Sequence, residues 1–305
     1  METTSDCITI KLETAHRFMA IVDELPTVPS LVMRIAGKLN DPDVSIDEIT
    51  DLLLQDQVLT TRVLRLISSP YFSPLQHLRN MKEAIVYLGL DRIKEAVFTC
   101  SVIDLFWSSG EGEVNRSTIW AHALCVAQLT KIIAEELEYP EPFSAYVAGL
   151  LHDIGAVFLN CYRGKDFRSA ICFTETEGLN LFEAENRLFG TSHCEIGAIL
   201  ATKWELDEPV KDSILYHHDL ESVPAGNVAL VALVSLADMF CSIYGYGYEE
   251  GDISRLRKES LEEHPAWNHL QVALQRQFVP QDILLKVKHC FKRVRIGIDE
   301  MFPKS

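Results

Sequence analysis

The dipeptide His152-Asp153 places an imidazole beside a carboxylate inside an unusually apolar segment, residues 142–159. Apolar and small residues surround the pair, so we expect this segment to form a buried helix. An unpaired buried carboxylate is costly, and a buried charge is therefore normally paired or bound to a metal. A divalent metal ion would satisfy both side chains together. Gly149 and Gly155 flank the pair and would let other backbone or a bound ion come close.

Further His and Asp residues lie in, or at the end of, mostly apolar predicted helices. They are His122, His193, His217, His218 and Asp238. Imidazole and carboxylate ligands suit iron, manganese, zinc or nickel. The lack of Cys at these positions argues against a structural zinc site. We therefore expect one or two divalent transition-metal ions, with iron or manganese favoured over nickel or zinc.

Taken alone, each of these residues also has an ordinary structural explanation. A single His on a helix face, such as His122 or His193, is usually a core or surface histidine. His217 and His218 could be a solvated pair at a helix C-terminus, where the helix dipole favours positive charge. Asp238 could cap a helix or form an ion pair, although its own apolar run contains no Lys or Arg. Asp153 remains the hardest to explain without a metal.

Composition limits the classes of protein to consider. The 305 residues suffice for one large or two ordinary domains, and 48% hydrophobic with 24% charged residues is typical of a soluble globular protein. A net charge of -16 argues against broad binding to nucleic acid or anionic membrane. The eight cysteines include no Cys-x-x-Cys pair, and the N-terminus has no secretory signal, so we expect reduced thiols and a cytoplasmic location. The longest uncharged apolar run, Val228 to Ala237, is shorter than the roughly 20 residues of a membrane helix.

Helix signals dominate and strand alternation is almost absent, so we predict an all-α fold. Ser45 and Glu48 form a Ser-x-x-Glu capping box before one predicted helix. A Gly- and Ser-rich linker at 107–113 divides the chain into a helical bundle, residues 1–108, and a metal-binding domain with a C-terminal helical extension, residues 109–305. The predicted helices span residues 14–24, 30–39, 57–68, 81–88, 92–106, 117–138, 142–162, 167–177, 181–189, 192–204, 208–216 and 227–244, with three helical pieces after 252.

Residues 84–99 have the outline of a helix-turn-helix split at Leu88-Gly-Leu90. Its second helix begins Asp91-Arg-Ile-Lys-Glu and then becomes apolar. A helix that reads DNA is normally basic and exposed. Two core helices that meet at a glycine are the better interpretation, and we do not expect nucleic acid or membrane as partners.

The order His, His-Asp, His, His-His, Asp resembles the HD superfamily of metal-dependent phosphohydrolases. The fuller pattern resembles its HDOD branch, the HD-related output domains of bacterial signalling proteins. This resemblance covers about residues 18–245 and implies an N-terminal bundle packed on an HD-like domain. The segments that carry it are Leu25-Pro-Thr-Val-Pro-Ser30, 39–45, 56–65, 84–90, 120–122, 148–155 and 189–197.

The resemblance also implies ligand roles. His122, His152, Asp153 and Asp238 match the positions that hold a first metal, and Asp153 would bridge two metals. The extra histidines that hold a second metal in HD-GYP phosphodiesterases correspond to His193, His217 and His218. Ala156 stands where the HD-GYP pattern has Lys, and no Gly-Tyr-Pro follows the paired histidines. These departures put hydrolysis of cyclic di-GMP in doubt and leave metal binding untouched.

Two functional interpretations follow. The first is a bacterial signalling output protein that acts through a ligand or a protein partner, with a metal that is structural or senses a signal. The second is a metal-dependent phosphohydrolase that acts on a nucleotide or cyclic dinucleotide, with Arg187 as a candidate contact to phosphate. A nucleotide or phosphate ligand would fit either interpretation.

Overall fold

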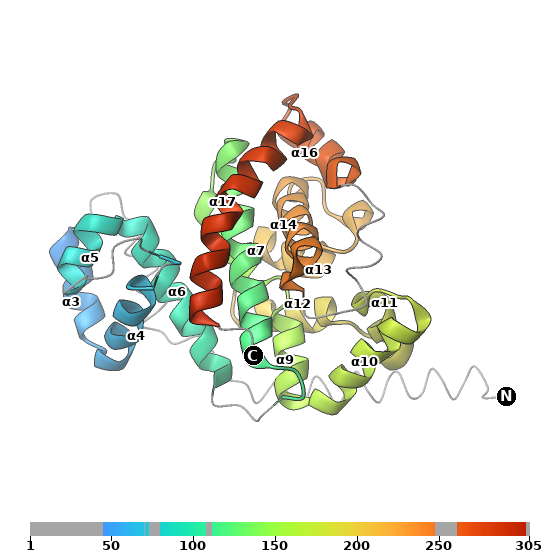
Figure 1. Ribbon diagram of the computed structural model, residues 1–305, viewed down its shortest axis with the longest axis horizontal. Helices are drawn as coiled ribbons and strands as arrows, with labels where there is room; N and C mark the ends of the chain where they lie inside the picture. Colours follow the sequence, from blue (N-terminus) through green and yellow to red (C-terminus); the bar gives the residue numbers. More distant parts are fainter. Residues whose placement is uncertain (1–44, 70, 73–79, 108–111, 248–260, 303–305) are drawn as a thin grey trace. The chain divides into compact units, whose positions relative to one another are not determined.

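The computed structural model describes residues 45–69, 71–72, 80–107, 112–247 and 261–302, and every regular element in these ranges is a helix (Figure 1). The predicted all-α fold is confirmed. The helices expected at 14–24 and 30–39 lie outside the described residues. The chain forms two compact units. Residues 109–288 belong to the first unit, and residues 27–108 together with 289–305 belong to the second.

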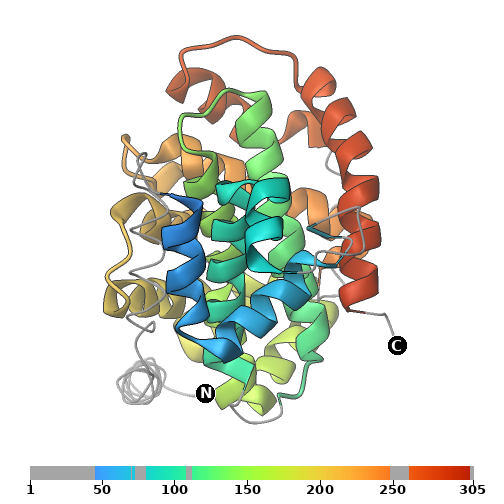
Figure 2. The ribbon, with the colours of Figure 1, turned by 90° about the vertical axis from the view of Figure 1, so that its left-hand side faces the viewer.

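The described residues of the second unit before residue 108 form four successive helices, which are coloured blue to blue-green in Figure 2. They are α3 (Ile46–Leu54), α4 (Gln57–Ile67), α5 (Met81–Leu88) and α6 (Leu90–Trp107). The predicted capping box is present: Ser45 N donates to Glu48 Oε2 at 3.2 Å, and Glu48 N donates to Ser45 Oγ at 3.1 Å. Gly89 joins α5 to α6 with φ +81°, a conformation that favours glycine.

Helix α6 is a core helix. Residues 93–100 are all buried, and they include the charged Lys94 and Glu95 at 7% and 0% exposure. A helix buried over this length does not present the exposed basic face that reads a DNA groove. The structure therefore favours two core helices over a helix-turn-helix in this segment.

The C-terminal helix α17 (Pro280–Met301) spans the boundary between the units, because its residues from His289 onward group with the second unit. Within that unit Gly297 packs so tightly that a Cβ atom there would overlap the backbone of Tyr71. The division into residues 1–108 and 109–305 that the sequence predicts stays a prediction.

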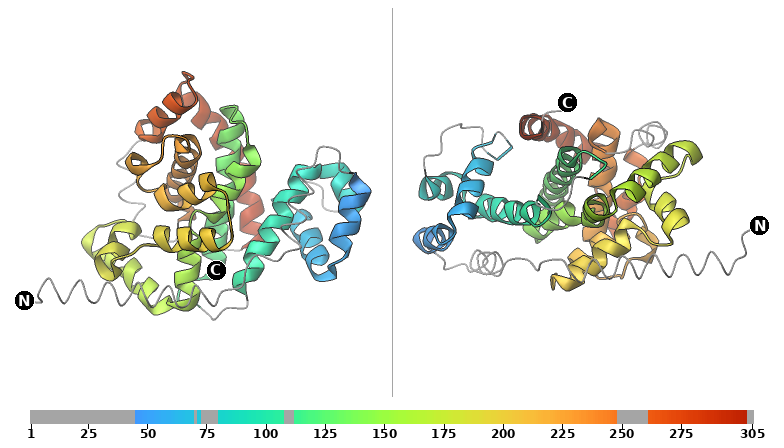
Figure 3. Two further views of the ribbon diagram at one scale, coloured as in Figure 1. Left: turned by 180° about the vertical axis from the view of Figure 1, so that it is seen from behind. Right: turned by 90° about the horizontal axis from the view of Figure 1, so that it is seen from below.

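The described helices between residues 112 and 273 belong to the first unit, which Figure 3 shows from behind and from below. In chain order they are α7 (Arg116–Glu136), α8 (Pro142–Leu151), α9 (Ile154–Tyr162), α10 (Gly164–Glu177), α11 (Leu181–Phe189), α12 (His193–Lys203), α13 (Glu208–Tyr216), α14 (Val228–Cys241) and α16 (Ala266–Ala273). Helix α7 packs on α8 and α14, and α12 packs on α9 and α13. Short helical turns lie at Leu220–Ser222, Ser242–Tyr246 and Leu261–Glu263.

One predicted helix is wrong in an informative way. The sequence predicts a single helix over 142–162, but α8 ends at Leu151 and α9 begins at Ile154, with His152 and Asp153 in a turn between them. The chain can turn here because Asp153 leaves helical geometry, with φ -105° and ψ 23°. The His-Asp pair thus occupies a break between two buried helices.

Two glycines allow the close helix contacts that surround this break. A Cβ atom on Gly149 would lie 2.8 Å from Ala127 Cα and 2.7 Å from Thr130 Oγ1, both on α7. A Cβ atom on Gly155 would overlap the carbonyl group of His193, at the start of α12. The prediction that these glycines let other backbone come close is confirmed. They bring the turn at 152–153 against α7 on one side and α12 on the other.

Two stretches are long and apolar enough to cross a membrane by composition alone, Pro142–Tyr162 and Val228–Tyr246. Their most apolar windows are 83% and 61% buried inside the structure. Such burial is typical of core helices in a folded domain. The second stretch is longer than the apolar run recognised in the sequence, because Ser242–Tyr246 continues α14 as a wider helical turn.

Candidate metal centre

All seven predicted ligand residues lie in the first unit, on or beside six of its helices. His122 is on α7, His152 and Asp153 lie between α8 and α9, and His193 opens α12. His217 and His218 directly follow α13, and Asp238 is in the last turn of α14. Five of the seven are buried, with exposures of 5% or less, namely His122, His152, Asp153, His193 and His217. The Asp238 side chain is 16% exposed and His218 is exposed.

Four of the histidines use the same ring nitrogen, Nδ1, to hold their orientation. Nδ1 of His122 lies 2.8 Å from the Tyr246 carbonyl oxygen, and Nδ1 of His152 lies 2.8 Å from the Gly149 carbonyl oxygen. For His217, Nδ1 lies 3.0 Å from the Ile214 carbonyl oxygen and 3.2 Å from that of Ser213. A carbonyl can only accept, so each Nδ1 carries the proton and donates it.

His193 is held by a carboxylate instead of a carbonyl. Glu185 Oε2, on α11, lies 2.7 Å from His193 Nδ1 and also accepts the backbone N–H of His193 at 2.7 Å. Glu185 is completely buried. A His with Nδ1–H bonded to carbonyl or carboxylate presents a basic Nε2, which is the usual arrangement of a metal-ligating histidine.

The four Nε2 atoms all point toward Asp153, and its two oxygens divide them into two pairs. Asp153 Oδ2 lies 3.3 Å from His152 Nε2 and 3.5 Å from His122 Nε2. Asp153 Oδ1 lies 3.4 Å from both His193 Nε2 and His217 Nε2. Two ligand atoms each about 2.1 Å from one ion, at a tetrahedral angle, lie about 3.4 Å apart. The spacing on both sides of Asp153 therefore matches that of atoms that share a cation.

Asp238 belongs to the Oδ2 side of this arrangement. Its Oδ1 lies 3.3 Å from His122 Nε2 and 3.9 Å from His152 Nε2. His122 and His152 are themselves close, with 3.2 Å between their Nε2 atoms. Two carboxylates and two imidazoles thus meet around one small volume.

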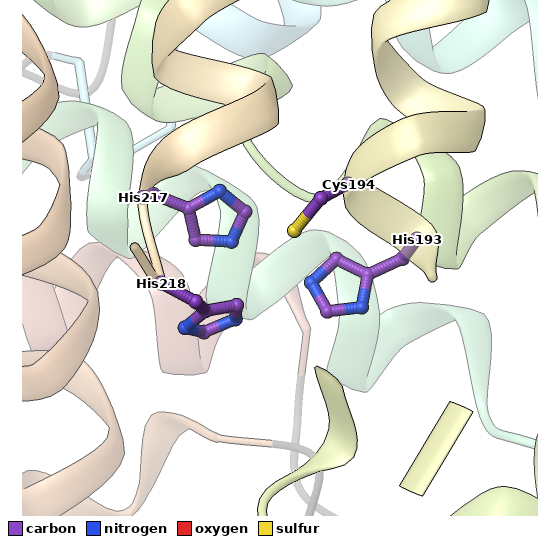
Figure 4. A group of neighbouring side chains, drawn as sticks. All are labelled: His193, Cys194, His217 and His218. Carbon is purple, nitrogen blue, oxygen red and sulfur yellow. The ribbon is translucent and has the colours of Figure 1, made fainter. Parts of the chain in front are cut away.

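His218 belongs to the opposite side, together with a residue that the sequence reasoning left out. Single side-chain donor atoms from His193, Cys194, His217 and His218 all lie within 4.8 Å of one another (Figure 4). The His218 ring centroid is 4.1 Å from that of His217 and 5.2 Å from that of His193. A second group of the same kind comprises His122, His152 and Asp153.

The pKa values reflect this concentration of carboxylates and imidazoles. Burial lowers the pKa of His122, but its hydrogen bonds to Asp153 and Asp238 outweigh burial and raise that pKa to about 10. Burial raises the pKa of Asp153, but the charges of His152 and His193 outweigh it and hold the pKa well below its usual range. The pKa of Asp238 is lowered against burial by its hydrogen bond from His122. The carboxylates of this site therefore require positive charge beside them.

The residues fit a metal ion on a second ground as well. His193 Nε2 and His217 Nε2 are buried, at 1% exposure for each residue, and neither has a hydrogen-bond partner among the described residues. A buried polar atom without a partner is costly and calls for an explanation. A cation beside Asp153 would satisfy both nitrogens. The two His-containing clusters thus suggest metal binding.

Two residues of the centre, Glu185 and Cys194, were not predicted from the sequence. A Glu between Ala184 and Asn186 on an amphipathic helix carries no signal of burial, although its position eight residues before His193 could have raised the question. Cys194 directly follows a predicted ligand, His193, and this adjacency is the signal that could have pointed to it. Arg187 lies on the exposed face at the end of α11. Ala156, in place of the HD-GYP lysine, is fully buried on α9.

Known proteins share this sequence pattern and fold. The sequence profile of the HDOD domain matches residues 25–220. A crystal structure of an HDOD domain protein of unknown function from Geobacter sulfurreducens is 46% identical, with a TM-score of 0.83 over 97% of this chain and 100% of that chain. A candidate phosphohydrolase from Shewanella amazonensis SB2B has the same fold, with a TM-score of 0.68 at 21% identity over 92% of this chain and 96% of that chain.

A curated protein from Treponema pallidum is 28% identical over 72% of this chain, but the match covers 42% of that protein. The chain thus spans less than half the length of this relative. The matched profile covers most of the chain and includes six of the seven residues at the centre, all except Asp238. Together with the 46% identity over a complete solved chain, this match shows that the chain belongs to the HDOD family.

Proposed function

We propose that this protein is a bacterial, cytosolic signalling protein of HDOD type whose HD site binds divalent metal, and that it acts mainly by binding a ligand or a protein partner. One observation carries the metal-binding part of the proposal. Four histidines donate through Nδ1 to fixed acceptors and direct Nε2 toward the buried carboxylate of Asp153. Four basic nitrogens and an acceptor-only carboxylate in a buried volume need a cation among them.

The division at Asp153 supports two metal positions. His122, His152 and Asp238 would hold one ion on the Oδ2 side. On the Oδ1 side His193, His217 and His218 would hold the other, and Asp153 would bridge the two. Iron or manganese suits the nitrogen- and oxygen-rich first position, with nickel or zinc as alternatives. A bound ion would act as a Lewis acid and lower the pKa of a bound water.

A metal-dependent phosphohydrolase that acts on a nucleotide or cyclic dinucleotide is the second candidate. Exposure of His218 and partial exposure of Asp238 favour it, because they leave one side of the centre within reach of solvent and ligand. Against it, Ala156 supplies no cation for a phosphate, and Arg187 lies on an exposed face of α11. Phosphoryl transfer depends strongly on cationic groups that neutralise developing charge. The binding function therefore comes first.

The test is elemental analysis of untagged protein purified without chelator under low oxygen, followed by a screen of nucleotides and cyclic dinucleotides. We expect about two equivalents of transition metal per chain and no turnover above background. Asp153→Asn should lose metal at both positions, whereas the control His289→Gln, at an exposed position of α17, should keep it. If no metal copurifies and none is taken up on reconstitution, the metal-binding proposal fails. Turnover by metal-loaded protein that Asp153→Asn abolishes would establish the phosphohydrolase instead.

A further inference from the structure

We propose that Cys194 is a metal ligand, and that its thiolate makes the position beside His193 and His217 selective for thiophilic divalent ions. This inference rests on the proposed metal binding and adds a ligand to it. The other position, near His122 and Asp238, offers nitrogen and oxygen only. The two positions would therefore differ in the metal that they prefer.

The first support is the placement of the thiol. Cys194 is completely buried and is the second residue of α12, directly after His193. Donor atoms of His193, Cys194, His217 and His218 lie within 4.8 Å of one another. In Figure 4 the sulfur atom points into the space between the His217 and His193 rings. Donors at about 2.0–2.3 Å from one ion are at most about 4.6 Å apart, so only a small adjustment is needed.

The second support is independent of the cysteine. His193 Nε2 and His217 Nε2 are buried polar atoms that lack a hydrogen-bond partner among the described residues. Each is 3.4 Å from Asp153 Oδ1, so both face the same small volume. Two fixed imidazoles and a carboxylate oxygen form three corners of a coordination shell. The thiol of Cys194 supplies a fourth donor from the adjacent residue of the same helix.

The chemistry of this donor set determines which ions it selects. Thiolate is a soft ligand that favours zinc, cobalt, cadmium or ferrous iron over magnesium, calcium or manganese. Imidazole, thiolate and carboxylate together are the ligand types of four-coordinate zinc sites. The donor set therefore indicates a thiophilic ion at this position.

Cobalt(II) titration of metal-free protein without oxygen tests the inference, because thiolate-to-cobalt charge transfer absorbs in the near ultraviolet while bound cobalt itself absorbs in the visible. We expect wild-type protein to show both signals and Cys194→Ser to lose the near-ultraviolet band. Cobalt affinity at this position should fall at least tenfold in that variant. The matched control is Cys172→Ser, at an exposed cysteine of α10, which should keep the band.

Other outcomes separate this inference from the metal-binding proposal. Visible cobalt bands without a thiolate band in wild-type protein would overturn the role of Cys194 and leave metal binding intact. A thiolate band that persists in Cys194→Ser would assign it to another cysteine and overturn the inference. If cobalt does not bind at all, both proposals fail. Cys194→Ala, measured in parallel with circular dichroism, shows whether any loss comes from unfolding, and we expect native helix content.

Discussion

Glu185 offers a sharp test of how this centre is built, because it accepts hydrogen bonds from His193. Its Oε2 accepts two hydrogen bonds of 2.7 Å, one from His193 Nδ1 and one from the His193 backbone N–H. Glu185→Gln keeps the shape of the side chain and removes its negative charge. The amide oxygen can still accept, but it no longer increases the basicity of His193 Nε2.

The expected loss of metal affinity follows from the role of carboxylates that hydrogen-bond to a metal-ligating histidine. Loss of a carboxylate that orients a metal-ligating histidine typically weakens metal binding about 10–100-fold, which is about 1.4–2.7 kcal/mol. Folding stability should fall as well. Glu185 Oε2 and His193 Nδ1 form a buried pair at 2.7 Å, and removing the charge of one partner in a buried pair is destabilising, by up to about 3–5 kcal/mol. We therefore expect the chelator-treated variant to unfold at a lower urea concentration than the wild type.

The assay is competition of the protein with a chelator of known affinity, together with urea unfolding of chelator-treated protein. Metal content of Glu185→Gln should fall from about two equivalents toward about one at limiting free metal, because the position near His122 and Asp238 does not contact Glu185. The control Glu175→Gln, at an exposed position of α10, should match the wild type in both measurements. Unchanged affinity in Glu185→Gln would refute the positioning role, and loss of both ions would refute the separation of the two positions.

Three further predictions concern backbone fit, pH and proton release. Gly155→Ala should cost about 1–3 kcal/mol of unfolding free energy in urea, since its Cβ would overlap neighbouring backbone, whereas Gly226→Ala, with open space around it, should stay within about 0.5 kcal/mol. Burial lowers the pKa of His264 from 6.5 to about 4, so its contribution to stability is complete above pH 6.5 and is lost as the pH falls toward 4. His264→Asn keeps an acceptor for the Ala266 N–H. The unfolding free energy of this variant relative to wild type should improve by up to about 3 kcal/mol as the pH falls from 7 to 4. A stability difference that does not change with pH would contradict the assignment. His122 has a pKa of about 10 and must lose its proton to bind metal, so metal affinity should rise about tenfold per pH unit near neutrality. Chelator competition at several pH values measures this dependence. A metal affinity that does not change with pH would contradict the prediction.

Local signals predicted much of the fold. Helices α11 and α13 have the predicted bounds, Leu181–Phe189 and Glu208–Tyr216, because each is preceded by a residue that favours helix starts, Asn180 and Asp207. The capping box at Ser45 and Glu48 also forms as the sequence predicts. Such signals are contained within a few residues, so no tertiary information is needed to recognise them.

The break between α8 and α9 could not be predicted in the same way. Residues 142–162 are apolar throughout, and a continuous buried helix has the same composition as two helices joined by a turn. The turn at Asp153 is favoured by contacts with distant residues, including the approach of Gly155 to the His193 backbone. Glu185 and Cys194 were missed for a related reason, since their roles depend on the packing of α11 against α12.

The turn at residues 152–153 also explains how adjacent residues serve one centre. On a continuous helix, neighbouring side chains point about 100° apart, so His152 and Asp153 would face different helices. In the turn, His152 Nε2 instead lies 3.3 Å from Asp153 Oδ2, while Asp153 Oδ1 reaches His193 and His217. A single carboxylate can therefore contact histidines from α7, α12 and the end of α13 at once. The local departure from helical geometry is thus the feature that makes a shared, two-sided site available to this sequence.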